Sequence, residues 1–437
     1  MQRHQLIVPS LVGLFATFTL TACGDDTGGK PPADASASEA AAGNAAIDGG
    51  SNDAAPSANG GPNGIVVVHS DYQSASVSYL DRDGNVLKDG CFNSGTGAQG
   101  LSMTLSGDIA LPTQTALGGA VVIVDRGNAA LTWLDPVTCA PLRQLSVGTG
   151  FAANPHDLVE LSAAKAYVTR FEENAQATPA PGDFDDGDDL LIIDPTQSKI
   201  LGRIDLKPYA PAGSGVLPRA DRALLAQGKV FVSLNGISSD YASYGIGRIA
   251  MIDPSTDQVV GTIDLPGTKD CGAMVYLESE KKLLVACNGA FSDGPMQADS
   301  SAIVAIDLAA TPPVVVARVA AAAAAGLSYS NGTVAALDGN TVLGVTNGDL
   351  AGGSSDRLWS LPLSGAQPVM VFESATAFAL GAILVDAPRG RVFVTDGTST
   401  GSPSLRVFGS TAGALTATGT IGSNPSQKLP PRGLAWY

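Results

Sequence analysis

Short apolar runs alternate with turn residues along this chain, and the same arrangement recurs at a period of about fifty residues. The clearest copies are "LLIIDPTQSKILGRIDL", beginning at Leu190, and "IAMIDPSTDQVVGTIDL", beginning at Ile249. In each copy two apolar runs flank a turn of Asp, Pro, Ser and Thr, which predicts an antiparallel hairpin. Further copies, some degraded, begin at Val77, Leu131, Ile303, Leu358 and Leu405.

Two more β-branched or apolar runs precede most of these hairpins. Second-strand runs such as "AYVTR" and "VFVSLN" begin at Ile65, Ala120, Ala166, Val230, Leu283, Thr341 and Val392. First-strand runs precede six of them, beginning at Leu101, Asp157, Arg222, Ala273, Thr333 and Ala382. Four strands in each of seven repeats predict an all-β, seven-bladed β-propeller.

The two ends of the repeat region complement each other. The first repeat opens at Ile65 on a second strand, and the chain ends on "RGLAWY", which matches the first-strand pattern. We therefore expect the C-terminal strand to complete the first blade. Such a closure removes the exposed edges that an open sheet must otherwise protect.

The sequence "AYVTRF", followed by "LLIIDPTQSKILGRIDL", resembles the YVTN-type β-propeller repeat family of exported and surface proteins. The resemblance covers about residues 64–437 and is strongest in blades three and four. It implies the propeller fold. Propellers of this kind include binding modules and relatives of lactonases and quinoproteins, so the resemblance implies no single chemistry.

The N-terminus has the features of an export signal. Arg3 precedes an apolar stretch at residues 6–20, and "LTAC" ends at Cys23. This ending resembles the bacterial lipobox, which implies a signal peptide at residues 1–22, lipidation of Cys23 and a membrane anchor of acyl chains. Gly24 stands where the family's inner-membrane sorting Asp would stand, which favours the outer membrane. The alternative is an ordinary secretory signal followed by an unrelated Cys.

The segment after Cys23 is typical of a flexible tether. Residues 24–63 consist mainly of Ala, Gly, Ser, Asp and Pro with a single Ile and no aromatic residue, so residues 23–63 cannot form a packed core. The formal net charge of -16 and the lack of a basic run argue against nucleic acid as a partner.

Unequal loops point to one end of the propeller as the functional end. Connections from second to third strand are long at residues 171–188, 235–247 and 288–301. The blade-to-blade joints place polar residues at the same end, namely Gln99, His156, Arg219, Asp221, Asp270 and Arg432. These residues either bind an anionic or carbohydrate ligand, with His156 as a proton carrier, or pair with one another and cap the blades.

One loop has the oxygen-rich composition of calcium loops. The stretch "GDFDDGDDL" contains Asp183, Asp185, Asp186, Asp188 and Asp189 around a glycine. The bidentate Glu of a complete EF-hand loop is missing. The two readings are a Ca²⁺ site and a solvated acidic loop.

Four cysteines remain beyond Cys23. Cys271 and Cys287 flank a predicted hairpin and should face each other on neighbouring strands, so we predict a disulfide between them. Cys91 and Cys139 then form a pair by elimination.

Three classes of function fit these features. The first is a membrane-anchored envelope propeller that binds a ligand or an envelope protein. The second is a lactonase-like hydrolase, with or without dependence on Ca²⁺, with its site at the mouth of the channel. The third is a structural envelope protein without a ligand.

Overall fold

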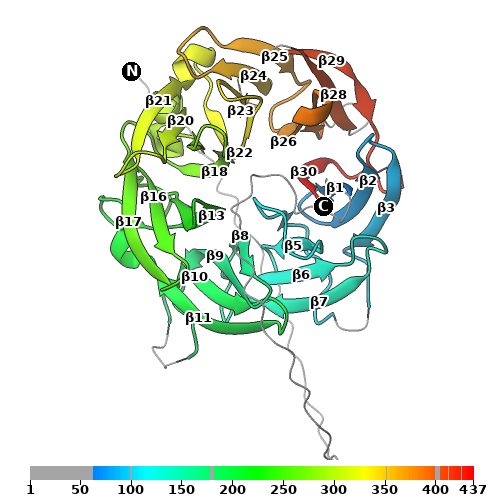
Figure 1. The fold of residues 1–437 in the computed structure, drawn as a ribbon, viewed down its shortest axis with the longest axis vertical. Coiled ribbons are helices and arrows are strands. Elements are labelled where there is room, and N and C mark those ends of the chain that lie inside the picture. The colour runs from blue at the N-terminus through cyan, green and yellow to red at the C-terminus, as the bar shows by residue number, and fades with distance from the viewer. Residues whose placement is uncertain are drawn as a thin grey trace, which may run out of the picture. The chain divides into compact units, whose positions relative to one another are not determined.

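The computed structural model describes residues 63–98, 101–177, 182–350, 352–398, 404–411, 413–424 and 426–437. The chain divides into two units, Met1–Ile47 and Asp48–Tyr437, and the described residues all belong to the second. They form a seven-bladed β-propeller, in which seven four-stranded antiparallel sheets surround a central channel (Figure 1). The predicted fold class is confirmed. Cys23 and Gln99 lie outside the described residues.

Each blade is a meander whose first strand lies next to the channel. From the channel outward, blade one contains β30 (Pro431–Trp436), β1 (Gly64–Ser70), β2 (Ala75–Asp81) and β3 (Val86–Asn93). Blade two contains β4 (Ile109–Ala110), β5 (Val121–Asp125), β6 (Ala130–Leu134) and β7 (Pro141–Ser146). Blade three contains β8 (Pro155–Ser162), β9 (Lys165–Glu173), β10 (Gly187–Asp194) and β11 (Lys199–Asp205).

The remaining blades repeat this order. Blade four contains β13 (Ala220–Ala226), β14 (Lys229–Leu234), β16 (Gly247–Asp253) and β17 (Gln258–Leu265). Blade five contains β18 (Cys271–Leu277), β19 (Lys282–Cys287), β20 (Ala302–Asp307) and β21 (Val314–Ala320). Blade six contains β22 (Tyr329–Ala336), β23 (Thr341–Thr346), β24 (Arg357–Pro362) and β25 (Val369–Glu373). Blade seven contains β26 (Leu380–Asp386), β27 (Arg391–Asp396), β28 (Ser404–Thr411) and β29 (Ala414–Ile421).

Shorter elements lie in the connections. Two short strands, β12 (Val216–Leu217) and β15 (Ile237–Ser238), pair with each other above blade four. The 3-10 helices are η1 (Lys207–Tyr209), η2 (Phe291–Ser300), η3 (Ala321–Ala324) and η4 (Ala387–Arg389). The long loops of blades four and five are thus partly folded. Within the described residues, none of the helices has the length and apolar character needed to cross a bilayer.

The apolar core lies between neighbouring blades. Middle strands such as β5 and β6 are buried along their whole length, which explains why their sequences are almost continuously apolar. Outer strands such as β17 alternate between exposed and less exposed positions because one face meets solvent. One core cluster joins blades four and five, and another joins blades one and seven. Each blade is therefore stabilised mainly by its two neighbours.

The C-terminal strand closes the ring as predicted. Strand β30 pairs antiparallel with β1, with Trp436 opposite Ile65 and Leu434 opposite Val67. The closure continues at the strand end, where Tyr437 N donates to the Gly64 carbonyl at 3.1 Å. Trp436 packs in the cluster that joins blades one and seven. The first blade thus contains strands from both ends of the repeat region.

One predicted strand is wrong. The run "LSMTLS" at Leu101 is not a strand, and the first strand of blade two is the short β4 instead. The run packs because Leu105 is buried between blades one and two. Its backbone is held by a side chain, since Ser102 N and Met103 N both donate to Gln144 Oε1 at 3.0 Å. The run resembles a strand because its apolar residues are buried, although its backbone does not pair with a neighbouring strand.

Both predicted disulfides are present. Cys271 and Cys287 lie opposite each other on β18 and β19 and are bonded. Cys91, on the outer strand β3, is bonded to Cys139 in the hairpin turn of blade two. The second bond joins two neighbouring blades covalently.

We predict a pH-dependent contribution to stability from His69. This residue is fully buried in β1, where its Nε2 lies 2.9 Å from Ser423 Oγ. Burial lowers the pKa of His69 from 6.5 to about 4. The unfolded chain therefore takes up a proton at His69 between pH 6.5 and 4 that the folded chain does not. As the pH falls through that window, the folded protein should lose about 3 kcal/mol of stability through this group.

The measurement is the free energy of unfolding in urea from pH 7 to pH 4 for the native protein and for His69→Gln. The carboxylates titrate alike in both proteins, so the difference between the two curves isolates His69. Parallel curves over this range would show that His69 does not contribute.

Candidate functional site

One ring of equivalent positions lines the channel at the end where the second-to-third-strand loops lie, which we call the mouth. In every blade, a backbone N–H near the end of the second strand or just after it donates to a carbonyl just before the first strand, as Asn235 N does to Arg219 O at 3.0 Å. Counting two residues on from each such carbonyl gives the equivalent residues: Ala110, His156, Asp221, Gly272, Ser330, Gly381 and Arg432. Ionisable side chains at this level thus come from only three blades, one, three and four.

A β-bulge begins most first strands at this level. In blade four, Ala220 pairs with Leu234 and Ala223 pairs with Val232, so two residues of β13 stand opposite one residue of β14. The same irregularity is present in blades three, five and seven. A bulge breaks the strict alternation of side chains, so the neighbours Asp221 and Arg222 both contribute to the mouth.

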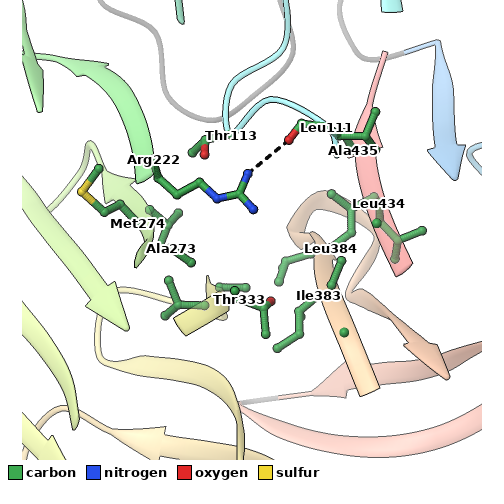
Figure 2. Close-up of a pocket in the computed structure, with 18 of the residues that line it drawn as sticks. Leu111, Thr113, Arg222, Ala273, Met274, Thr333, Ile383, Leu384, Leu434 and Ala435 are labelled. Atoms are coloured by element: carbon green, nitrogen blue, oxygen red, sulfur yellow. Dashed lines mark hydrogen bonds between the residues drawn. The ribbon is translucent and has the colours of Figure 1, made fainter. Parts of the chain in front are cut away.

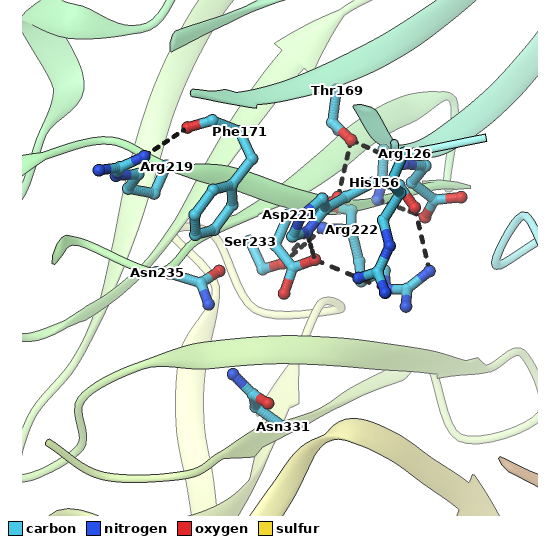
Figure 3. A network of polar contacts seen from close by, with 12 residues as sticks. Arg126, His156, Thr169, Phe171, Arg219, Asp221, Arg222, Ser233, Asn235 and Asn331 are labelled. Atoms are coloured by element: carbon cyan, nitrogen blue, oxygen red, sulfur yellow. Dashed lines mark hydrogen bonds and ion pairs between the residues drawn. The ribbon is translucent and has the colours of Figure 1, made fainter. Parts of the chain in front are cut away.

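His156 and Asp221 form a hydrogen-bonded pair across two blades. His156 Nδ1 lies 2.7 Å from Asp221 Oδ1, and the imidazole stacks on Phe171 with ring centroids 4.4 Å apart. Because an ionised carboxylate only accepts, Nδ1 carries the proton and Nε2 is the nitrogen left for another partner. Figure 3 shows this pair with the guanidinium groups of Arg126 and Arg222 beside it.

The charges around Asp221 decide its ionisation. Burial acts to raise the pKa of the Asp221 carboxyl, but the charge and hydrogen bond of His156 and the charges of Arg222 and Arg126 bring that pKa below its ordinary value. For Asp270, in the next blade, burial outweighs the hydrogen bonds that lower the pKa. Burial raises the pKa of Asp270 to about 6, and the nearby charge of Asp221 adds to this effect.

A cavity of about 1180 Å³ occupies the channel. Three arginines from three blades line it, namely Arg126, Arg222 and Arg432. Figure 2 shows the Arg222 side chain extending into this space, with Ala273 and Met274 on one side and Ile383 and Leu384 across from it. The cavity therefore combines these cationic groups with apolar walls and with two carboxylates, Glu278 and Asp338.

These three arginines differ in their partners. Arg126 forms an ion pair with Asp108. Arg222 Nη1 donates to the carbonyls of His156 at 3.2 Å and Leu111 at 3.5 Å, and its nearest carboxylate oxygen is Asp221 Oδ1 at 3.6 Å. Arg432 donates to the carbonyls of Ser70 and Phe378, and no salt bridge joins it to a carboxylate among the described residues. Backbone carbonyls hold both guanidinium groups in place; Arg222 also forms the longer salt bridge to Asp221, whereas Arg432 forms none among the described residues.

A segment of blade two crosses the channel beneath the mouth. Thr113 donates through its N–H and its hydroxyl to Asp157, at 2.8 and 2.6 Å. Gln114 exchanges two hydrogen bonds with the backbone of Leu225, and the Thr115 hydroxyl donates to the Trp436 carbonyl. The segment thus ties blades one, two, three and four together and supplies the Leu111 carbonyl that holds Arg222.

The structure brings only some of the predicted site residues together. His156, Asp221 and Arg432 occupy equivalent positions at the starts of their first strands, and of these three only Arg432 lines the cavity. Arg219 does not line the cavity: it is 1% exposed, forms an ion pair with Glu172, and stacks between the rings of Phe171 and Tyr241, each 5.0 Å from its guanidinium carbon. Its role is to fasten the long loops of blades three and four to each other.

Arg126 and Arg222 were not predicted as site residues. Arg126 occupies a short loop, whereas in the sequence only the long loops indicate function. It stands, however, at the position of Asn235 and Asn288 in the repeat, which an alignment of the repeats could have revealed. Arg222 follows Asp221 directly, and regular alternation in a strand would direct it away from the channel side.

The acidic loop is arranged around arginines. Asp189 is fully buried and receives two hydrogen bonds of 2.7 Å from Arg170, while Asp186 pairs with Arg203 at 2.9 Å. Asp188 accepts from Arg219 N at 3.1 Å, and burial raises its pKa to about 7. In the part of the chain that the structure describes, no three His, Cys, Asp or Glu side chains are grouped to hold a metal ion. The geometry gives no support to a Ca²⁺ site made of Asp183, Asp185, Asp186, Asp188 and Asp189.

Comparison with solved structures supports the fold. A candidate 6-phosphogluconolactonase from Bacteroides fragilis matches 88% of this chain over its whole length, with a TM-score of 0.55 and 12% identity. A second one, from Bacteroides uniformis, matches 86% of this chain over its whole length, with a TM-score of 0.54 and 9% identity. A hypothetical selenium-binding protein from Sulfolobus tokodaii gives a TM-score of 0.54 at 10% identity, covering 85% of this chain and 93% of its own.

These likenesses establish a seven-bladed propeller and nothing finer, because identity is so low. No family model and no curated protein matches the chain. The YVTN-type repeat therefore stays a prediction from the sequence.

Proposed function

We propose that this propeller binds a small organic anion in the mouth of its channel. The observation that carries the proposal is the placement of Arg222 and Arg432 on one cavity of about 1180 Å³, where backbone carbonyls hold both guanidinium groups and the salt bridge from Arg222 to Asp221 is 3.6 Å long. A guanidinium group in a partly desolvated pocket needs an anionic partner, and it recognises carboxylates and phosphates by paired hydrogen bonds.

The cavity walls indicate the rest of the ligand. Below the arginines the lining is largely aliphatic, with Met274, Val334 and Leu384, and Ser330 and Thr333 add hydroxyl groups. Such a site suits a molecule with an anionic head and a body of mixed polarity, such as a sugar acid or a sugar phosphate. This is the anionic or carbohydrate ligand that the sequence predicted.

We predict that Arg222→Gln and Arg432→Gln each weaken binding of the ligand by about 10- to 100-fold, because each removes a charge-assisted hydrogen bond. Isothermal titration with a panel of sugar acids and sugar phosphates, including 6-phosphogluconate, and with neutral glucose measures this.

Arg318→Gln is the matched control. Arg318 also donates to two backbone carbonyls, those of Gly267 and Asp299, but it does not line the cavity. It should bind the anion like the native protein. Equal losses in all three variants, or binding of neutral glucose as tight as that of the acids, would contradict the proposal.

A second function is favoured by the His156–Asp221 pair and by the names of the two Bacteroides neighbours. We propose lactone hydrolysis at the same mouth as this alternative. His156 Nε2 accepts a proton from water while the water oxygen attacks the lactone carbonyl, and Asp221 stabilises the imidazolium through Nδ1. The ring C–O bond then breaks, and the imidazolium returns the proton to the leaving alkoxide.

This alternative predicts that His156→Gln lowers kcat for 6-phosphogluconolactone by about 100-fold or more while the product still binds. Direct assay of lactone opening against the uncatalysed rate measures it, with Arg318→Gln as control. A native protein that opens no lactone above the rate in buffer would leave only the binding function.

We propose that the protein acts at the cell envelope, anchored by lipid at Cys23 and more specifically at the outer membrane. Two disulfides, Cys91–Cys139 and Cys271–Cys287, are in keeping with an oxidising compartment. An envelope location would expose the cavity to metabolites or cell-wall products outside the cytoplasm.

The anchor predicts that Cys23→Ala, or globomycin treatment, moves the protein from the membrane fraction to the soluble fraction and alters its processed mass. Fractionation and mass spectrometry of the native and variant proteins measure both effects. An unchanged distribution would mean that residues 1–22 act as an ordinary secretory signal.

A further inference from the structure

Asp270 is a buried carboxylate surrounded by carboxamides from three blades. Its Oδ1 lies 2.6 Å from Asn235 Nδ2 and 2.9 Å from Asn331 Nδ2, and its Oδ2 lies 3.4 Å from Asn288 Nδ2. Asp270 precedes β18, Asn235 follows β14, Asn288 follows β19, and Asn331 lies in β22. Figure 3 shows the side chains of Asn235 and Asn331 directed toward one another from separate blades.

Two of the three carboxamide oxygens of this group lack partners. Asn235 is 4% exposed, and its Oδ1 is buried without a hydrogen bond; Asn288 Oδ1 is buried and unpartnered as well. The two ends of a carboxamide have the same shape, so half a turn of the terminal bond exchanges N and O. After that exchange the oxygens would stand where the nitrogens now face Asp270, all directed at one small space.

A second carboxylate faces the same space. A Cβ built on Gly272 would lie 2.5 Å from both Asp221 Oδ2 and the Asn331 carbonyl, so the lack of a side chain at Gly272 keeps this region open. Asp221 and Asp270 also interact electrostatically. Two carboxylates and three carboxamides thus converge at the junction of blades four, five and six.

The negative charge of Asp270 has no countercharge close to it. No salt bridge joins Asp270 to a basic side chain among the described residues, whereas Asp221 has His156, Arg222 and Arg126 beside it. A buried carboxylate without a countercharge costs free energy that amide donors offset only in part. A bound cation would supply the missing charge.

We infer that Asp221, Asn235, Asp270, Asn288 and Asn331 form a Ca²⁺ site at the mouth of the channel. All five side chains offer oxygen, the donor that Ca²⁺ prefers, and Ca²⁺ accepts six to eight oxygens in flexible geometry. Water would complete the shell on the channel side. The site is separate from the acidic loop at residues 183–189 and does not depend on the anion or the reaction proposed above.

The test uses the purified full-length protein, stripped with EDTA and titrated with CaCl₂. We expect one saturable Ca²⁺ per chain by titration calorimetry and a higher Tm in Ca²⁺ than in EDTA. Asp270→Asn should weaken Ca²⁺ binding by about 100-fold, the factor that accompanies loss of one buried charge contact. The double variant Asp183→Asn, Asp186→Asn is the control and should bind like the native protein.

Asn235→Asp keeps the test decisive even where Asp270→Asn fails to fold. If the group binds a cation, Asn235→Asp adds a negatively charged ligand to it. The variant should then have a lower Tm than the native protein in EDTA and regain stability in Ca²⁺. The difference in Tm between Ca²⁺ and EDTA should therefore be larger for the variant than for the native protein. If the asparagines serve only as donors to Asp270, the new carboxylate destabilises the protein equally in both conditions, which overturns the inference. Absence of saturable Ca²⁺ binding in the native protein, or its loss in the acidic-loop control alone, overturns it as well.

Discussion

Pairing of the last strand with the first is the constraint on which the rest of this molecule depends. Strand β30 reaches β1 from the far end of the repeat region, and Trp436 packs there in the apolar cluster with Phe393 and Leu405 of blade seven. Each blade buries its faces against two neighbours, so an open ring would leave two faces and two sheet edges in water. Closure also fixes seven first strands around one channel, where residues from different blades come together.

The channel mouth derives its chemistry from differences among otherwise equivalent positions. The same backbone hydrogen bond and, in most blades, the same bulge set the start of the first strand. At that fixed place the side chain is a histidine, a carboxylate, an arginine or a small residue, depending on the blade. The repeats thus supply a frame of constant geometry, and the site results from the few positions where the repeats disagree. Asp221 is central to it, since it bonds to His156, lies near Arg222 and faces the Asp270 group.

The architecture could be predicted from the sequence because each repeat shows the same pattern of strands and turns. Fifty-residue periodicity, an unmatched first strand at the end and hairpin-flanking cysteines each led to a confirmed element. The errors in strand prediction arose where residues are buried without pairing in a β-sheet. Leu105 is buried without a strand, and the crossing segment with Thr113 replaces most of the expected inner strand of blade two.

The site was harder to predict for a physical reason. Bulges cancel the two-residue period, so the direction of Arg222 could not be derived from spacing. Arg219 has the same position in the repeat as Asp270. Its guanidinium group, however, stacks on aromatic rings of the blade-three and blade-four loops and does not extend into the channel. Such stacking contacts depend on loop conformations, which the pattern of strands does not specify.

The mouth of the channel, rather than the outer surface or the acidic loop, is where we propose that this protein binds its ligand. A crystal structure of the protein soaked with tungstate, a strongly scattering stand-in for phosphate, is the sharpest test. We expect anomalous density inside the channel within hydrogen-bond distance of the Arg222 and Arg432 guanidinium groups. Density confined to surface lysines and arginines, with the channel holding none, would contradict it.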